Sequence, residues 1–340
     1  MNNLFKNKVI LITGGTGSFG SNFLKKLIFT HKNFKKIIIF SRDELKQFEL
    51  QNSIKSPLIK KCRFFIGDIR DKSRLIRALD GVDIVIHAAA LKQVPAAEYD
   101  PFEFIKTNVI GAQNLIEASL DSNVKKVIAL STDKAAGAIN LYGATKLCSD
   151  KLFSSANNIV GKKKIKFSVV RYGNVFGSRG SIVPLFTSQQ KKKEFITVTD
   201  KRMTRFNISL EDGIKMVEWS LNNMKGGEIF VPKIPSFRVM DLAKVFASQK
   251  KIKVIGIRPG EKLHEEMITT SDSFSTYDLG KYYVIINPSN KNIIKYYSNY
   301  KKFAQFKSYS SDQNNNFLTT LELSRLVKNF KKTKLKNFNY

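Results

Sequence analysis

Two short segments near the middle of the chain carry side chains that suit oxidation of an alcohol and acid–base elimination. Ser131-Thr132-Asp133-Lys134 is followed, eight residues after Lys134, by Tyr142, and Lys146 stands four residues beyond that tyrosine. On a helix, Tyr142 and Lys146 share one face. Positive charge from the ammonium group and from a cofactor stabilises phenolate, so Tyr142 can take a hydroxyl proton while hydride leaves the same carbon. Helices also carry this spacing by chance, so the prediction depends on the surrounding elements.

A glycine-rich segment near the N-terminus supplies that context. It follows the apolar run 9–12 and precedes the amphipathic pattern 22–28. Strand, glycine turn and helix start are the setting of a dinucleotide fingerprint. Glycines let the backbone approach a pyrophosphate, and the helix start binds its negative charge. The cofactor-binding residues expected in this loop are Gly14, Thr16, Gly17, Ser18, Phe19 and Gly20.

The residues after the next strand, 36–40, bear on the choice between NADP and NAD. An NAD site has an acid about twenty residues past the glycines, where it holds the ribose hydroxyls. Here Ser41 and Arg42 come first, and a guanidinium suits the extra phosphate of NADP. Asp43 and Glu44 keep NAD open, because the register can shift by one residue. The sequence therefore favours NADP.

Two later strand ends extend the predicted cofactor surface. Asp68 follows the strand 63–66, where its carboxylate can bind the adenine. The strand 82–86 runs into His87 and then into small residues that begin with Ala88. Small side chains at the carboxyl end of a strand leave room for a cofactor in a doubly wound sheet. A lone histidine at a strand end is more often structural, so His87 is not assigned to catalysis.

Length and patterning predict an α/β enzyme with two unequal lobes. Strand and helix patterns alternate over the first half of the 340 residues, which indicates a Rossmann-type doubly wound parallel sheet with a smaller C-terminal lobe. The stretch 288–316 is expected to be mostly loop with a short strand, and 318–330 has helical spacing. The expected division is a nucleotide lobe over 1–175 and about 202–232, a substrate lobe over 176–201 and 233–330, and a frayed basic tail over 331–340.

Composition argues against a membrane or metal protein. No apolar run is long enough to span a bilayer, and the start does not resemble a signal peptide. Two cysteines without metal spacing and three isolated histidines predict reduced thiols, no metal site and a cytoplasmic location.

The formal net charge of +30 raises nucleic-acid binding as a hypothesis. The lysines are spread along the chain, and no basic stripe alternates with aromatic residues as in a nucleic-acid module. Positive charge also suits anionic ligands such as NADP and a sugar nucleotide. We therefore expect no nucleic-acid partner.

The chain resembles the extended short-chain dehydrogenase/reductases and, within them, the inverting UDP-N-acetylglucosamine 4,6-dehydratases of pseudaminic acid biosynthesis. The resemblance extends from about residue 8 to 285, with a further match at YSSDQNNN (309–316). The segments that carry it are LITGGTGSFG (11–20), SRDELKQFE (41–49), FFIGDIRD (64–71), IHAAALKQVPAAEY (86–99), ALSTDKAA (129–136), NLYGATKLCSDKLF (140–153), RYGNVFGSRGS (171–181), MTRFNISLEDG (203–213), GGEIFVPKIPS (226–236) and GIRPGEKLHEEMI (256–268).

This resemblance implies a reaction on UDP-N-acetylglucosamine. Hydride leaves C4 for NADP, with Tyr142 as the base and Lys146 assisting, and the 4-keto group then acidifies the C5 proton. Asp133 is placed like the family acid that protonates the departing C6 hydroxyl, and Thr132 like the residue that binds the C4 oxygen. Hydride returns to C6, so the cofactor is regenerated within each turnover. The family is usually oligomeric, so a homo-oligomer is expected.

Lys134 distinguishes the inverting enzymes from their retaining relatives, which commonly have glutamate here as the C5 base. A lysine base must be neutral, which requires a pKa lowered by burial or by positive neighbours. In the inverting enzymes that the chain resembles, lysine accompanies reprotonation of C5 from the opposite face. Lys134 is therefore expected to be catalytic, either as the C5 base or by positioning groups.

The resemblance also assigns residues that bind ligands. The arginine side chains among these residues suit a diphosphate, because a guanidinium group binds phosphate oxygens in a bidentate manner. The remaining cofactor-binding candidates are Lys46, Ile69, Lys92 and Thr107, and the substrate-binding candidates are Lys92, Asn174, Arg179, Arg258 and Glu261.

Two departures from the family pattern concern the site. Asn-Pro often stands where this chain has Gly137-Ala138, and an aromatic residue often stands in place of Asn207. Neither change removes a proposed chemical group. A retaining dehydratase or a UDP-sugar 4-epimerase is the nearest alternative, although an epimerase has no leaving hydroxyl for Asp133 to protonate. An NADP-binding regulator or nucleic-acid-binding protein without catalysis is the alternative from another class.

Overall fold

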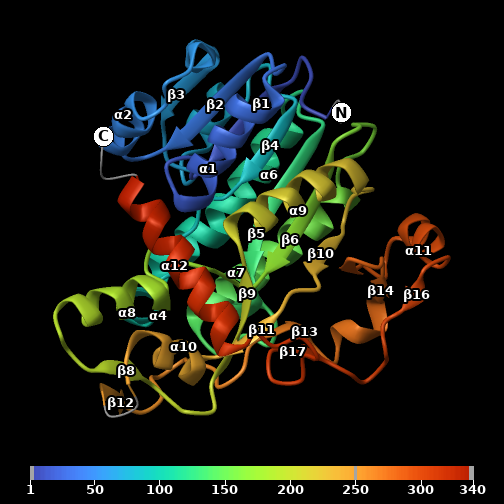
Figure 1. The fold of residues 1–340 in the computed structure, drawn as a ribbon. Helices are drawn as coiled ribbons and strands as arrows, with labels where there is room; N and C mark the ends of the chain where they lie inside the picture. The colour runs from blue at the N-terminus through green and yellow to red at the C-terminus, as the bar shows by residue number, and fades with distance from the viewer. Residues whose placement is uncertain (1–3, 249–250, 337–340) are drawn as a thin grey trace.

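A ten-stranded sheet forms the centre of the molecule, whose computed structural model describes residues 4–248 and 251–336 (Figure 1). The strand order is β16-β14-β15-β10-β6-β5-β4-β1-β2-β3. Pairing is parallel from β3 to β10, and β15, β14 and β16 extend the sheet in antiparallel fashion. The strands are β1 (Val9–Thr13), β2 (Lys36–Ser41), β3 (Cys62–Ile66), β4 (Ile84–His87), β5 (Lys126–Thr132), β6 (Lys166–Tyr172), β10 (Ile229–Pro232), β14 (Thr276–Asp278), β15 (Tyr282–Ile285) and β16 (Lys301–Lys302). The predicted doubly wound parallel sheet is confirmed.

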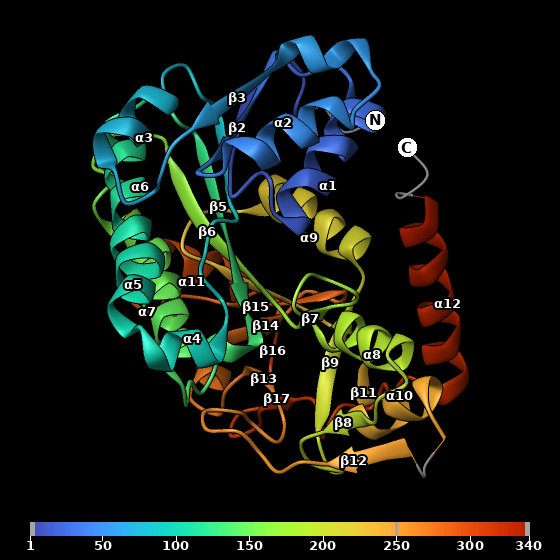
Figure 2. The same ribbon diagram turned by 90° about the vertical axis from the view of Figure 1, so that its left-hand side faces the viewer.

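Helices cover both faces of this sheet, as a buried parallel sheet requires. In Figure 2, α1, α2 and α9 lie on one face, and α3, α5, α6 and α7 lie on the other. These helices are α1 (Ser18–Lys26), α2 (Glu44–Asn52), α3 (Lys72–Ala78), α5 (Pro101–Ile105), α6 (Gly111–Leu120), α7 (Leu141–Ser155) and α9 (Leu210–Asn223), with α4 (Val94–Tyr99) preceding α5. Short turns of other helix types are η1 (Leu27–His31), η2 (Pro57–Lys61), η3 (Lys106–Ile110), η4 (Asp133–Ala135) and η5 (Ala156–Asn158).

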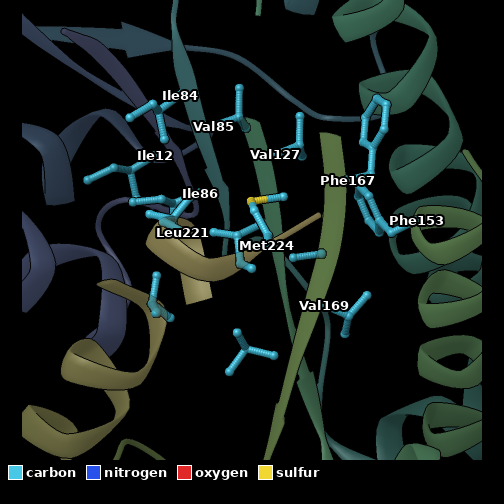
Figure 3. Packing of buried hydrophobic residues seen from close by; sticks show 14 of the residues in the cluster. Ile12, Ile84, Val85, Ile86, Val127, Phe153, Phe167, Val169, Leu221 and Met224 are labelled. Carbon is cyan, nitrogen blue, oxygen red and sulfur yellow. The ribbon is translucent and has the colours of Figure 1, made fainter. Parts of the chain in front are cut away.

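The core forms where these helices meet the strands. Figure 3 shows β-branched side chains of β1, β4 and β5, such as Ile12 and Val127, gathered in one core with Leu221 of α9 and Phe153 of α7. All five residues of β1 are buried, which explains why its sequence is continuously apolar rather than alternating. The core therefore fixes the strand ends that carry the site.

A second, smaller apolar cluster lies apart from the main core. Phe186, Leu242 and Leu323 are fully buried in it and come from three different helices. Three small sheets, ordered β11-β9-β7, β12-β8 and β13-β17, lie outside the main sheet. The elements are β7 (Asn174–Val175), α8 (Ile182–Lys191), β8 (Ile196–Val198), β9 (Thr204–Ile208), β11 (Ser236–Arg238), α10 (Val239–Phe246), β12 (Ile252–Val254), β13 (Glu266–Ile268), η7 (Asp272–Ser275), α11 (Lys291–Tyr297), β17 (Tyr309–Ser310) and α12 (Thr320–Lys336).

The C-terminal third differs in part from the expectation. The stretch 288–316, predicted to be mostly loop, contains α11, capped at its start by the Asn290 side chain. The helix predicted over 318–330 continues as α12 to Lys336, so part of the expected frayed tail is helical, while 337–340 lie outside the described residues. The main sheet also continues into strands from 276–302, so the division into two lobes stays a prediction.

A buried arginine links the helix α7 to the C-terminal part of the chain. Arg171, 1% exposed on β6, forms ion pairs with Asp150 of α7 at 3.2 Å and with Asp272 at 3.3 Å.

Within the described ranges, no helix combines the length and apolar character needed to cross a bilayer.

Candidate functional site

The carboxyl ends of β1, β4 and β5 meet at a cavity of about 640 Å³. This is the point where the strand order reverses between β1 and β4, which is where doubly wound sheets bind ligands. Predicted cofactor-binding residues that line the cavity are Gly14, Gly17, Ser18, Phe19, Gly20, Lys46, Ala88, Lys92, Tyr142 and Lys146.

The glycine loop has the close backbone packing that a dinucleotide cradle requires. Gly14 has φ +62°, and a Cβ there would lie 2.8 Å from the backbone of Ala89. A Cβ on Gly20 would lie 2.6 Å from the Cα of Gly15. The helix α1 starts after Gly17, which offers no side-chain cap, and its first residues, 18–20, line the cavity, so the helix start is placed to bind a pyrophosphate. The residues present fit a nicotinamide dinucleotide.

Gly14→Ala is expected to weaken cofactor binding at least tenfold, because the new methyl group meets backbone and the left-handed φ is strained. Cofactor titration by fluorescence would measure this loss. Gly161→Ala is the matched control, since Gly161 also has a positive φ of +57° but nothing lies near its Cβ position. Equal loss in both variants would contradict a specific role for the close approach at Gly14.

The residues predicted at the adenine ribose form their own contacts at the ends of β2 and β3. Asp43 caps α2 by accepting a hydrogen bond from the Lys46 N–H at 2.9 Å. Arg42 lies 3.7 Å from Asp68, and the Ser41 hydroxyl accepts a hydrogen bond from Gln47 at 3.0 Å. The structure thus brings Lys46 to the cavity wall and places Ser41, Arg42, Asp43, Asp68 and Ile69 at the neighbouring strand ends.

Thr132, Asp133, Lys134, Tyr142 and Lys146 come together on the wall of the same cavity. Thr132 ends β5, and η4 carries the next two residues directly into the cavity. Asn140 caps α7 by accepting the Gly143 N–H at 2.7 Å, which sets where that helix begins. The cap places Tyr142 in the first turn and Lys146 one turn later.

Lys134 lies between two buried carboxylates. Its Nζ is 3.0 Å from Oδ1 of Asp133 and 3.0 Å from Oε1 of Glu265. Although burial opposes it, the charges of Asp133 and Glu265 raise the pKa of Lys134 above its ordinary value. The lowered lysine pKa expected for a neutral base is therefore wrong for this arrangement, and Lys134 is an ammonium group.

Asp133 is a deeply buried carboxyl group beside Lys134. Its side chain is 1% exposed, and burial raises its pKa, although Lys134 opposes the shift. Oδ1 accepts hydrogen bonds from Thr132 and Lys134, both at 3.0 Å, whereas Oδ2 has no partner among the described residues. A raised pKa favours proton donation by Asp133.

Burial also governs Tyr142 and Lys146. It raises the pKa of Tyr142 to about 12, although Lys134 acts in the opposite direction. Burial lowers the pKa of Lys146, whose Nζ donates a hydrogen bond to the Leu130 carbonyl at 2.8 Å. The expected phenolate near neutrality is not produced by these side chains alone.

His87 is a structural residue of the nearby strand end. It is buried and shares a hydrogen bond of 2.8 Å with the Thr13 hydroxyl. Burial lowers its pKa to about 3, so its ring is neutral.

A second cavity of about 280 Å³ adjoins the first and shares Lys92, Lys134 and Asn174 with it. The predicted substrate residues Arg258 and Glu261 line this second cavity. The loop that carries them is tied to the catalytic helix, because the side chain of Asn140 donates a hydrogen bond to the Gly260 carbonyl at 2.7 Å. The second cavity therefore opens directly onto Lys134.

Arg179 and Thr107 lie away from the second cavity. Arg179 donates a hydrogen bond to the Thr16 carbonyl at 3.1 Å, and its own carbonyl accepts one from Lys92 at 2.9 Å. It lines the first cavity rather than the second. Thr107 is buried in η3 and lines neither.

Sequence reasoning missed two charged residues of the site, Glu265 and Arg205. Both line the second cavity and are almost fully buried. Both stand inside segments that carried the resemblance, MTRFNISLEDG and GIRPGEKLHEEMI, but nothing in the sequence paired them with Lys134. The two departures also lie nearby: Gly137 has φ +53°, and Asn207 is buried opposite Asn174. No group of His, Cys, Asp and Glu suited to a metal occurs in the described part of the chain.

Comparisons with known proteins place these features in a family context. A model of the family described as "Polysaccharide biosynthesis protein" matches residues 10–287. A relative from Campylobacter jejuni (strain NCTC 11168), named "UDP-N-acetylglucosamine 4,6-dehydratase (inverting)", is 53% identical over 95% of this chain and 98% of its own length. A relative from Rickettsia akari, named "UDP-glucose 4-epimerase", is 41% identical over 95% of this chain and 96% of its own length. The solved structure of Pen from Bacillus thuringiensis is similar with a TM-score of 0.86 and 37% identity, covering 96% of this chain and 99% of that one.

Proposed function

This chain belongs to the polysaccharide biosynthesis protein family of extended short-chain dehydrogenases/reductases, and we propose that it is a UDP-N-acetylglucosamine 4,6-dehydratase that inverts C5. The product is UDP-2-acetamido-2,6-dideoxy-β-L-arabino-hex-4-ulose. We further propose NADP as the cofactor, a cytoplasmic homo-oligomer as the working form, and the first step of pseudaminic acid biosynthesis as the role.

The observation that carries this proposal is the position of Asp133 and Lys134 beside Tyr142. One cavity wall presents a phenol that can act on a hydroxyl, a buried acid and an ammonium group. Oxidation alone needs the phenol, whereas loss of water needs a proton donor for the leaving hydroxyl. The three groups together support oxidation coupled to elimination.

Each residue then has one role. A bound nicotinamide supplies the hydride exchange that oxidises C4 and later reduces C6. Tyr142 accepts the C4 hydroxyl proton, Lys146 assists it, and Thr132 binds the C4 oxygen. Asp133 donates its proton to the departing C6 oxygen, so that water leaves. The C5–H bond must also break, and Lys134 can take that proton once its ammonium proton has passed to Asp133, which lies 3.0 Å away and protonates the C6 oxygen. Reprotonation of C5 from the opposite face then completes the inversion.

Two alternatives use the same scaffold. A UDP-sugar 4-epimerase is supported by the name of the Rickettsia relative, and it would use Tyr142 and Lys146 but have no leaving hydroxyl. A retaining dehydratase would use Asp133 but return the C5 proton to its original face. The buried Asp133–Lys134 pair favours elimination, and lysine rather than glutamate at position 134 favours inversion.

The experiment follows purified protein with UDP-N-acetylglucosamine by proton NMR in deuterated water, with no cofactor added. A 4-keto-6-deoxy product with inverted, deuterated C5 is the expected result. A product that retains C5 configuration overturns the inverting assignment, and a 4-epimer alone overturns the dehydratase assignment. If protein that is shown to contain a nicotinamide cofactor does not convert UDP-N-acetylglucosamine, the assignment of this substrate is overturned. Cofactor binding without turnover, together with DNA binding that weakens as the salt concentration rises, would favour the alternative without catalysis.

A further inference from the structure

Glu265 is a buried carboxylate to which the proposed steps assign no role. It lies directly before β13, is 2% exposed, and its Oε1 is 3.0 Å from Nζ of Lys134. Its Oε2 is buried without a partner among the described residues. A charge this deeply buried is costly unless it is paired, so its pairing with a lysine in the reaction cavity calls for a functional reason.

The surrounding chain fixes Glu265 in place. Its N–H donates a hydrogen bond to the Ser311 hydroxyl at 2.9 Å, and its carbonyl accepts one from the Ser311 N–H at 2.8 Å. Arg205 of β9 places its Nε 3.5 Å from Oε1, and it forms a second ion pair with Glu261 at 3.5 Å. Three separate segments therefore meet at this carboxylate.

We propose that Glu265 is a positioning residue that holds the ammonium group of Lys134 against Asp133, and so keeps this pair ready for proton transfer during the loss of water. The proposal rests on the proposed function for its chemistry, but not for its geometry. Glu265 acts through Lys134 and Asp133, because its nearest functional contact is the ammonium group rather than the phenol of Tyr142.

The charges around Lys134 agree with this role. Asp133 and Glu265 face two cations, Lys134 and Arg205, and Arg205 also pairs with Glu261. Glu265 raises the pKa of Lys134 by attraction, and as a like charge it adds to the raised pKa of Asp133. Both effects favour the protonated form of the donor. The charged and titratable groups that face Lys134 are Asp133 of η4, Tyr142 of α7, Arg205 of β9, Glu265 before β13 and Lys92 of the loop after β4.

Glu265→Gln separates this role from a merely structural one. The amide keeps the shape and one acceptor oxygen but removes the charge. We expect water loss in a quenched single turnover to slow by about 10²-fold, because the donor pair loses its position and its protonation. Formation of reduced cofactor should change by less than about threefold, because Tyr142 and Lys146 are untouched. The 4-keto sugar before water loss should therefore accumulate.

Two further variants make the outcome decisive. Glu265→Asp restores the charge and should recover part of the lost rate. Glu117→Gln removes an exposed glutamate that pairs with Lys72 away from both cavities, and it should leave both steps unchanged. Equal slowing of both steps in Glu265→Gln, or an effect confined to KM, would overturn the proposal.

A readout without substrate keeps this proposal separate from the proposed function. Acylation of Lys134 by a slow amine reagent, followed by peptide mass spectrometry, reports the pH at which the side chain becomes neutral. Loss of the carboxylate lowers the pKa of Lys134, so reactivity should begin about one to three pH units lower in Glu265→Gln. An unchanged reactivity profile overturns the role of Glu265 even if the enzyme dehydrates its sugar. If the reactivity profile of Lys134 shifts as expected in a protein that leaves UDP-N-acetylglucosamine unchanged, only the proposed function is overturned.

Discussion

Tyr142→Phe is expected to lower turnover of UDP-N-acetylglucosamine by about 10²- to 10⁴-fold, the usual contribution of a positioned general base. The phenol is 8% exposed on the wall shared with Lys146, and the variant removes one hydroxyl without changing the packing. Formation of reduced cofactor in a single turnover should fall by the same factor, because every later step depends on oxidation at C4. Stopped-flow absorbance would measure the first step, and NMR would measure the product.

The pH dependence of that variant gives a second check. Burial raises the pKa of Tyr142 to about 12, so the basic form becomes more populated as pH rises and oxidation should accelerate over that range. Tyr142→Phe should lose this acceleration. Tyr282→Phe is the control, since it removes another buried phenol, on β15 against Trp219. Wild-type oxidation rates in Tyr142→Phe would assign the base to another group.

The glycine loop and the helix α7 could be predicted because their signals are local. Gly14 and Gly20 stand between a strand pattern and a helix pattern, and each lies where a Cβ would meet backbone. Tyr142 and Lys146 are four residues apart in one helix, so spacing alone puts them on one face. Local patterns of this kind do not need the rest of the fold.

Glu265 could not be predicted, because its meaning depends on distant parts of the chain. Lys134 and Glu265 are 131 residues apart in sequence, and they meet only because β13 packs beside η4. The expectation for the pKa of Lys134 fails for the same reason, because the sequence does not show that Glu265 lies beside it. Burial and positive neighbours alone would lower its pKa, but two carboxylates reverse the sign. α11 was missed for a different reason: it has only seven residues, and its one buried pair, Ile293 and Tyr297, is too short a pattern to stand out in a Lys- and Asn-rich stretch.

Asp133→Asn is expected to stop the reaction after oxidation at C4. The amide fits the same buried space, but it cannot donate an acidic proton to the departing C6 oxygen. Water loss should therefore fall by about 10²- to 10⁴-fold, while reduced cofactor still forms. Mass spectrometry of quenched samples would show a 4-keto sugar that keeps its C6 hydroxyl, and deuterated water would show whether its C5 proton exchanges.

The control for this variant is Asp278→Asn, which breaks another aspartate–lysine pair, with Lys233 at 2.6 Å, outside both cavities. It should dehydrate at the wild-type rate. If Asp133→Asn lost oxidation and water loss equally, Asp133 would serve to place Thr132 and Lys134 rather than to donate a proton. If Asp133→Asn slowed only the loss of water while the C5 proton still exchanged, the acid and the group acting at C5 would be different residues. That separation is what the geometry predicts, because Oδ2 of Asp133 has no partner among the described residues, while Oδ1 is held by Thr132 and Lys134.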